Sequence, residues 1–194
     1  MKLIITIAVA CASLIGIATD KITHASPLLG ADGGYVGRIK LASHLDEPRG
    51  YCLDVPGPAG NLLFHIPVWA HTCHASPQPD QIFRYNEEGS GLLRFVFEEH
   101  DLCLTAVERR EGSRFSYLPC TAPDRQAFDV DENGSFSLRD SELCLVVANM
   151  EDGGSQNEIG TGREVRATHR VRGLRLRQCE KGSLEMARWE AMQP

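Results

Sequence analysis

The chain has 194 residues and a formal net charge of −6, with 42% hydrophobic and 24% charged residues. This composition is that of a folded domain, so a mostly disordered chain is excluded. The acidic balance argues against a general nucleic-acid binder, because a phosphate backbone is held mainly by an excess of Lys and Arg. Eighteen Gly and ten Pro indicate many turns and favour short strands over long helices.

Residues 1–25 have the pattern of a secretory signal peptide. A lysine at the second position precedes an almost uncharged, mostly apolar run, and small residues permit cleavage after Ala18 or Ala25. The run has about 16 residues, whereas a membrane-spanning helix needs roughly 20. We therefore expect residues 26–194 to form one secreted domain (periplasmic in a Gram-negative source), with no membrane span. An uncleaved anchor and lipid attachment at Cys11 are the alternatives.

The expected mature chain keeps an even number of cysteines, which in an oxidising compartment indicates disulfide bonds before metal binding or catalysis. Six cysteines allow 15 pairings, and composition alone does not choose among them. These residues are Cys52, Cys73, Cys103, Cys120, Cys144 and Cys179.

Internal repetition is the most informative feature of the sequence. Three segments each contain a turn glycine, a short apolar strand and Cys-Leu, then a second strand that ends in cysteine, then an aromatic closing strand. The Cys-Leu pairs begin at Cys52, Cys103 and Cys144. The closing motifs are Gln81-Ile82-Phe83, Gln126-Ala127-Phe128 and Ala187-Arg188-Trp189. Between the last two cysteines, residues 148–170 show no period, so we expect an exposed loop.

From about residue 36 to residue 191 the sequence resembles the ricin-B-type lectins, which repeat a Cys-Leu-Asp, Cys and Gln-x-Trp unit three times. The resemblance implies an all-β fold, a β-trefoil, with repeats of about 37–90, 91–133 and 134–194. Four short strands cannot bury their own apolar face, so the three repeats are expected to close around the rings of Phe83, Phe128 and Trp189. It also implies one disulfide bond in each repeat: Cys52–Cys73, Cys103–Cys120 and Cys144–Cys179.

The resemblance further implies where a sugar would bind. Repeats that bind sugar keep an acid two residues after the first cysteine, because a carboxylate accepts hydrogen bonds from adjacent hydroxyls. Only the first repeat has this acid, Asp54, whereas the others have Thr105 and Val146. The predicted function is therefore a carbohydrate-binding, lectin-like module with at most one intact site, for which galactose-type glycans are the family's usual ligands.

The other expected contacts lie in the same repeat. The stacking position two residues before the second cysteine holds His71, and Trp69 stands where the family more often has a polar residue. Asp80 and Gln81 are the remaining polar contacts, although Gln81 is also expected to bond backbone groups, as is Gln126. Asp54 has its own alternative role, which is to bond the amides of the turn that follows it.

Two other clusters offer weaker interpretations. His65, His71, His74 and Cys73 suggest a metal site, but Cys73 is assigned to a disulfide bond, so no metal is expected. The third repeat is rich in arginine, and Arg175 with Arg177 would share one face of a strand, which suits an acidic glycan or a solvated face paired with acids.

No catalytic residues and no cofactor are expected, since the sequence lacks a nucleophile elbow and a phosphate-binding loop. The alternative function is a trefoil that has lost sugar binding and acts as a protein-interaction, adhesion, toxin-subunit or inhibitor domain.

Overall fold

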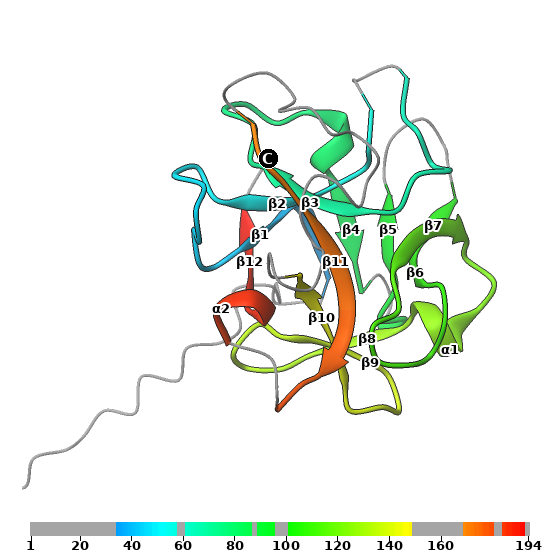
Figure 1. The fold of residues 1–194 in the computed structure, drawn as a ribbon. Helices are drawn as coiled ribbons and strands as arrows, with labels where there is room; N and C mark the ends of the chain where they lie inside the picture. Colours follow the sequence, from blue (N-terminus) through cyan, green and yellow to red (C-terminus); the bar gives the residue numbers. More distant parts are fainter. Residues whose placement is uncertain are drawn as a thin grey trace, which may run out of the picture.

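The structure is a computed structural model that describes residues 34–57, 61–86, 89–95, 101–148, 169–180 and 184–192. Twelve strands and three short helical turns form this part of the chain (Figure 1). The strands are β1 (Tyr35–Leu41), β2 (Tyr51–Asp54), β3 (Trp69–Thr72), β4 (Phe83–Tyr85), β5 (Leu93–Phe95), β6 (Leu102–Ala106), β7 (Phe115–Pro119), β8 (Phe128–Val130), β9 (Phe136–Leu138), β10 (Leu143–Val147), β11 (Val171–Gln178) and β12 (Trp189–Met192). The turns are η1 (Pro79–Gln81), α1 (Pro123–Gln126) and α2 (Leu184–Ala187).

The strands form three equivalent groups of four. In each group a central antiparallel hairpin, β2–β3, β6–β7 or β10–β11, is followed by one helical turn and an aromatic closing strand. The three predicted disulfide bonds, Cys52–Cys73, Cys103–Cys120 and Cys144–Cys179, each join the first strand of one hairpin to the residue that follows its second strand. The all-β prediction, with one disulfide bond inside each repeat, is confirmed.

Antiparallel pairs between consecutive groups close the sheet on itself. The last strand of each group pairs with the first strand of the next, in the pairs β4–β5 and β8–β9, and β12 returns to pair with β1. This cyclic pairing is the threefold closure of a β-trefoil. Isolated bridges between Leu92 and Ala127 and between Ser135 and Arg188 complete the ring, while β7 and β8 stand at the ends of the regular pairing path.

The core contains the three aromatic closers, Phe83, Phe128 and Trp189, all fully buried as predicted. Two turn glycines sit directly against them. Gly91 has φ +69° and Gly134 has φ +84°, and a Cβ on Gly134 would lie 2.3 Å from the carbonyl oxygen of Trp189. Glycine is required there because the left-handed conformation and the close approach of backbone both exclude a side chain.

Several strands are buried on both faces. All four residues of β3 and all five of β10 are buried. The outward face of β10 is covered by Ala187 of α2 and by the Cys144–Cys179 disulfide bond, which form a small second cluster with Val146. In this small domain, helical turns and disulfide bonds thus help to cover the outward faces of strands.

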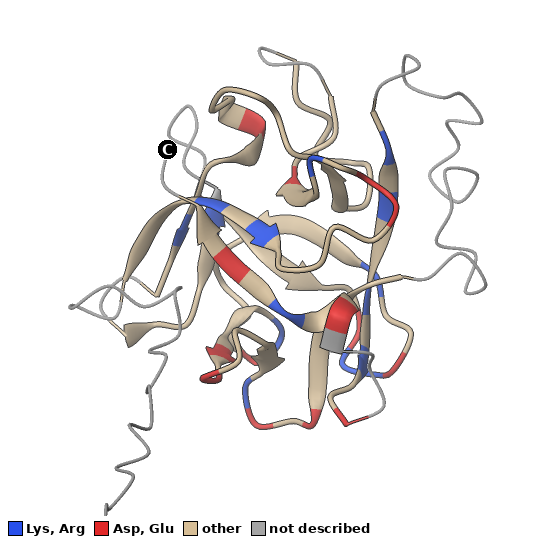
Figure 2. Ribbon diagram, turned by 90° about the vertical axis from the view of Figure 1, so that its left-hand side faces the viewer, with Lys and Arg blue, Asp and Glu red and all other residues tan. Residues whose placement is uncertain are grey.

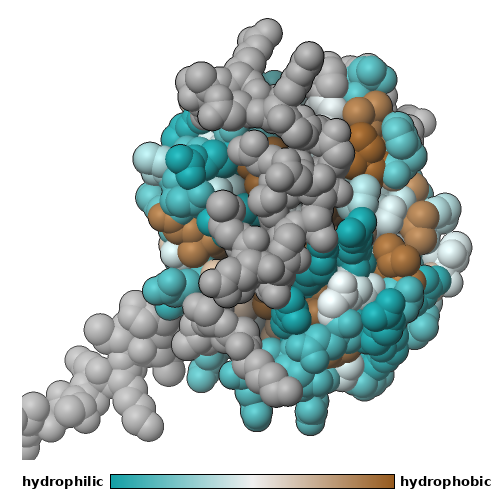
Figure 3. Space-filling view, viewed as in Figure 1, coloured by the Kyte–Doolittle hydropathy of each residue, from teal (hydrophilic) through white to brown (hydrophobic). Residues whose placement is uncertain are grey.

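The surface carries both signs of charge. Acidic and basic residues are interspersed along the ribbon in Figure 2, and the described part of the face in Figure 3 is largely hydrophilic with small separate apolar patches. Among the described residues, no helix has the length and apolar character to cross a bilayer. The predicted signal peptide, residues 1–25, and residues 149–168 of the predicted loop lie outside the described residues.

Candidate functional site

Asp54 lies at the centre of the candidate site. It ends β2 directly opposite Trp69 of β3, so both side chains project to one side of the hairpin. Its carboxylate is 2% exposed, and its Oδ1 accepts a 2.6 Å hydrogen bond from the Trp69 indole nitrogen. Its Oδ2 accepts a 2.8 Å hydrogen bond from Nε2 of Gln81. Both of these contacts are with side chains.

Gln81 ties the helical turn η1 to β3. Its Oε1 accepts a hydrogen bond from the backbone nitrogen of His74, and its Nε2 also donates to the carbonyl oxygen of Thr72. Gln126 does the same in the second repeat, where its Nε2 donates to the hydroxyl of Thr105. This is the structural role predicted for both glutamines, and it shows that Asp54 and Thr105 occupy equivalent positions.

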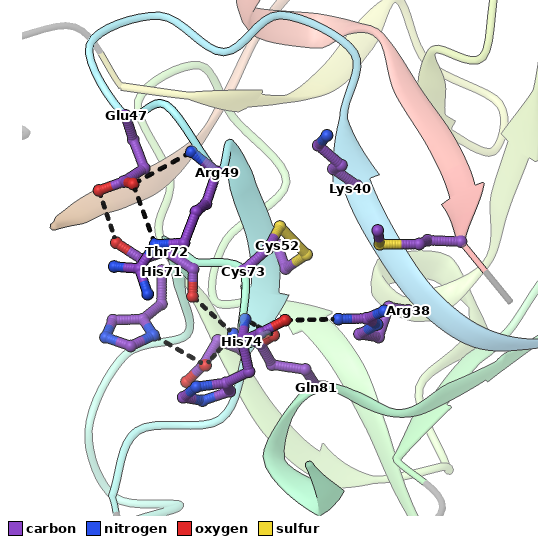
Figure 4. The surroundings of a disulfide bond; sticks show 12 residues. Arg38, Lys40, Glu47, Arg49, Cys52, His71, Thr72, Cys73, His74 and Gln81 are labelled. Carbon is purple, nitrogen blue, oxygen red and sulfur yellow. Dashed lines mark hydrogen bonds and ion pairs between the residues drawn. A yellow bond between two sulfur atoms is a disulfide. The ribbon is translucent and has the colours of Figure 1, made fainter. Parts of the chain in front are cut away.

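His71 follows Trp69 at the spacing that brings two strand residues to one face. Their rings stack at a centroid distance of 6.1 Å and an interplanar angle of 22°. His71 is only 7% exposed, because the rings of His74 and His169 lie 5.4 and 5.1 Å from it. Figure 4 shows His71 and His74 close together beside the Cys52–Cys73 disulfide bond. The predicted stacking face is therefore covered by two other imidazoles.

His169 is the site residue that the repeat pattern missed, since it lies in the predicted loop. Val171 of β11 pairs with His71 of β3, and the Thr72 backbone nitrogen donates to the carbonyl oxygen of Arg170. This antiparallel register places His169, the residue before Arg170, beside the end of β3. The end of the predicted loop is thus part of the site, and only knowledge of the β3–β11 pairing could have revealed it.

Asp80 comes from η1 and completes the cluster. Its Oδ2 lies 3.2 Å from Nε2 of His74, and the side chain is buried. Asp80 Oδ1 and His71 Nδ1 are both buried without a hydrogen-bond partner, although His71 Nδ1 lies 3.4 Å from Oδ2 of Asp54. The site therefore has polar capacity that the described protein groups do not use.

The ionisation of these groups reflects burial and close contact. Burial raises the pKa of Asp54 above its usual value, against the opposing effect of the nearby His71 imidazole. The hydrogen bond with Asp80 raises the pKa of His74. Burial and the neighbouring His71 lower the pKa of His169, which favours its neutral imidazole.

All five predicted binding residues, Asp54, Trp69, His71, Asp80 and Gln81, therefore lie in one connected cluster. The structure groups the residues considered for metal binding differently from the sequence prediction. His71 and His74 join Asp54, while Cys73 is held in its disulfide bond and His65 is exposed.

The described arginines of β11 do not form one accessible strip for an acidic glycan, and Arg177 pairs with Glu111 at 3.8 Å, in line with the alternative of arginines paired with acids. Arg175 is 7% exposed and donates to the carbonyl oxygen of Leu174, so it does not share a solvated face with Arg177. Arg172 is buried as well, because it pairs with Asp46 at 2.7 Å and stacks over the ring of Tyr51. The first six residues of β11, which lies between β3 and β10, are all buried, and the alternation of its sequence did not predict this.

Comparison with known proteins identifies the family. The model of the ricin-type β-trefoil lectin domain matches residues 43–164, more than half of the chain. The chain belongs to this family. A ricin-type lectin domain is a carbohydrate-binding kind of module, and the five predicted binding residues lie within the matched residues, whereas His169 lies just beyond them.

Solved ricin-type lectins share the fold at low sequence identity. The agglutinin from Abrus precatorius is 13% identical over 84% of this chain and 48% of that chain, with a TM-score of 0.56. The Macrolepiota procera ricin B-like lectin, solved in complex with lactose, is 13% identical over 82% of this chain and 96% of that chain, with a TM-score of 0.53.

A curated relative carries the domain within a much longer chain. Polypeptide N-acetylgalactosaminyltransferase 12 of Mus musculus is 27% identical over 97 residues, which are 50% of this chain and 16% of the relative. The chain therefore matches only about a sixth of that enzyme's length.

Proposed function

We propose that this ricin-type lectin domain binds a galactose-type glycan at a single site in the first repeat. The observation that carries the proposal is the Asp54 carboxylate. Asp54 is held between Trp69 and Gln81, and it is the only acid among the three equivalent positions.

The Asp54 carboxylate retains the capacity to accept further hydrogen bonds. An ionised carboxylate has about four acceptor positions on its two oxygens. Trp69 and Gln81 occupy two of them and fix the orientation of the group. The remaining positions suit two neighbouring sugar hydroxyls, and a carboxylate that is already oriented loses little entropy on binding.

Access to Asp54 requires the imidazoles above it to move. His74 and His169 are partly exposed, whereas His71 below them is buried. Rotation of His74 and His169 toward solvent would uncover the ring of His71 for stacking against the apolar face of a pyranose. Asp80, next to His74, would then offer a second carboxylate to the sugar.

The other two repeats lack the chemistry of this site. Thr105 and Val146 stand in place of Asp54, and Leu118 and Arg177 stand in place of His71. Thr105 is moreover buried and committed to Gln126. A single weak site gives millimolar to high-micromolar affinity unless several copies cluster, because avidity requires several sites engaged together.

One observation favours a second function, in which the trefoil binds a protein instead of a sugar. Asp54 and His71 are both buried. If the rings of His74 and His169 never move aside, the first repeat offers a binding partner only its outer surface. In this alternative the domain serves as an adhesion, toxin-subunit or inhibitor domain.

Export belongs to the same proposal. Disulfide bonds in all three repeats suit an oxidising compartment, and residues 1–25 have the pattern of a signal peptide. Intact mass measured on secreted protein should place the first residue near Ser26, or near Thr19 if the earlier cleavage site is used. A secreted chain that retains Lys2 would contradict cleavage.

A glycan array probed with the secreted protein tests the sugar-binding proposal. We expect signal on terminal galactose or N-acetylgalactosamine and loss of that signal in Asp54→Asn. A folded wild-type protein that binds no glycan on the array would support the protein-interaction alternative.

A further inference from the structure

We propose that Asp54, His71 and His74 form a binding site for a divalent transition metal such as Zn²⁺, with His169 as the fourth ligand. The proposal goes beyond sugar binding and does not depend on it, although two of its residues are shared with the proposed sugar site.

The three side chains already stand at nearly the spacing of metal ligands. Their potential ligand atoms all lie within 4.8 Å of one another, and His71 Nδ1 is 3.4 Å from Asp54 Oδ2. Zn²⁺ bonds of about 2.0–2.1 Å in tetrahedral geometry separate two donor atoms by about 3.3 Å. One pair thus needs no adjustment, whereas His74 would have to move closer to the other two to share the same centre.

The imidazole rings have a matching arrangement. The ring centres of His71, His74 and His169 are 5.4, 5.1 and 5.7 Å apart, so the three form a nearly equilateral triangle. Two imidazoles bound to one tetrahedral metal have ring centres about 5 Å apart. His169 enters this triangle from the residue before Arg170, across from the end of β3.

The surrounding groups provide the support that metal ligands usually have. Ligating carboxylates and imidazoles are commonly oriented by further hydrogen bonds. Asp54 is oriented by Trp69 and Gln81, and Asp80 lies 3.2 Å from a ring nitrogen of His74.

A buried and poorly satisfied atom points to the same place. His71 is more than nine-tenths buried, and its Nδ1 makes no hydrogen bond of good geometry with the described residues, because Asp54 Oδ2 lies 3.4 Å away. A buried polar atom left unpaired costs free energy, so such atoms require an explanation. A metal ion bound to His71 Nδ1 and Asp54 would remove that penalty.

The donor set also selects the class of metal. Two or three imidazoles with one carboxylate suit zinc, cobalt, nickel and copper, whereas calcium and magnesium prefer oxygen ligands alone. A bound ion would hold His74 and His169 in place over His71.

Titration of the untagged full chain tests the proposal without any sugar present. At about pH 7.5 we expect calorimetry with Zn²⁺ to show a single ion per chain, and Co²⁺ to give the intense visible absorption of a tetrahedral complex. His74→Ala should weaken Zn²⁺ binding by about tenfold or more and abolish the cobalt absorption. His169→Ala should weaken binding as well.

The matched control is His65→Ala, because His65 is an exposed histidine outside the cluster. It should bind Zn²⁺ as the wild type does. His74 is partly exposed, so its replacement is expected to leave the fold intact, which far-UV circular dichroism checks. A wild-type chain that binds no Zn²⁺, or a folded His74→Ala variant with unchanged affinity, would overturn the metal site and leave the sugar proposal standing.

Discussion

The indole nitrogen of Trp69 donates a 2.6 Å hydrogen bond to the carboxylate of Asp54, its partner across the β2–β3 hairpin. A polar residue is more usual at the position of Trp69 in the family that the sequence resembles, but the indole keeps a donor at this point. The aromatic ring adds a second contact by stacking on His71. Trp69 therefore orients the carboxylate and supports the ring next to it.

Trp69→Phe should destabilise the fold by about 1–3 kcal/mol, because it leaves one buried carboxylate oxygen without its donor. Urea unfolding followed by circular dichroism measures the loss. In a double-mutant cycle, Trp69→Phe should cost much less in an Asp54→Asn background, since the bonded partner has already changed. Equal losses in both backgrounds would show that the hydrogen bond contributes nothing to stability.

Gly134→Ala should destabilise the protein far more than Gly112→Ala. Both glycines have left-handed backbone, with φ of +84° and +81°. The conformation alone costs a non-glycine residue about 1–2 kcal/mol. A Cβ at Gly134 would also meet the Trp189 carbonyl oxygen at 2.3 Å, whereas a Cβ at Gly112 meets nothing within 4 Å. Thermal unfolding of the two variants measures the difference, and equal midpoints would contradict the close packing at Trp189.

We expect the free energy of unfolding to fall in acid as Asp46 becomes protonated. Burial raises the pKa of Asp46, but hydrogen bonds from Arg172, Tyr51 and Arg170 outweigh it and lower the pKa to about 2. A carboxyl group with a lowered folded-state pKa contributes stability that is present above its unfolded value near 3.8 and lost as the pH falls toward 2.

Asp46→Asn should therefore flatten the decline in unfolding free energy between about pH 4 and pH 2. At neutral pH it should cost only about 1 kcal/mol, because the Asp46 side chain is 37% exposed and solvent screens its charge. Asp129→Asn is the control, since Asp129 pairs with Arg139 at a site where it is 57% exposed. Chemical denaturation across this pH range tests both variants.

Local patterns predicted most of the fold, because each repeat carries its own cysteines, turn glycine and aromatic closer. Gly134 and Trp189 illustrate this, since each was recognisable within a single repeat and the two meet in the structure. Burial was harder to predict. Arg175 lies on an alternating strand that suggests exposure, but the first six residues of β11 are all buried.

The candidate site was likewise only partly predictable from the sequence. Asp54, His71 and Gln81 follow from the resemblance to the ricin-B-type lectins, because the binding positions of that family can be counted from motifs within one repeat. His169 does not, because its place depends on a pairing between β3 and β11, which belong to different repeats. The covering of His71 by His74 and His169 is likewise a tertiary effect that no motif in one repeat contains.

Calorimetric titration with lactose tests the central claim, a single sugar site in the first repeat, most directly. The wild type should bind one lactose weakly, and both Asp54→Asn and His71→Ala should lose about ten- to a hundredfold in affinity, as expected when a charged hydrogen-bond partner or a stacking ring is removed. Leu118→Ala changes the equivalent position of the second repeat, which is 40% exposed, and should bind as the wild type does. Unchanged affinity in a folded Asp54→Asn variant, or an equal loss in Leu118→Ala, would contradict a site in the first repeat.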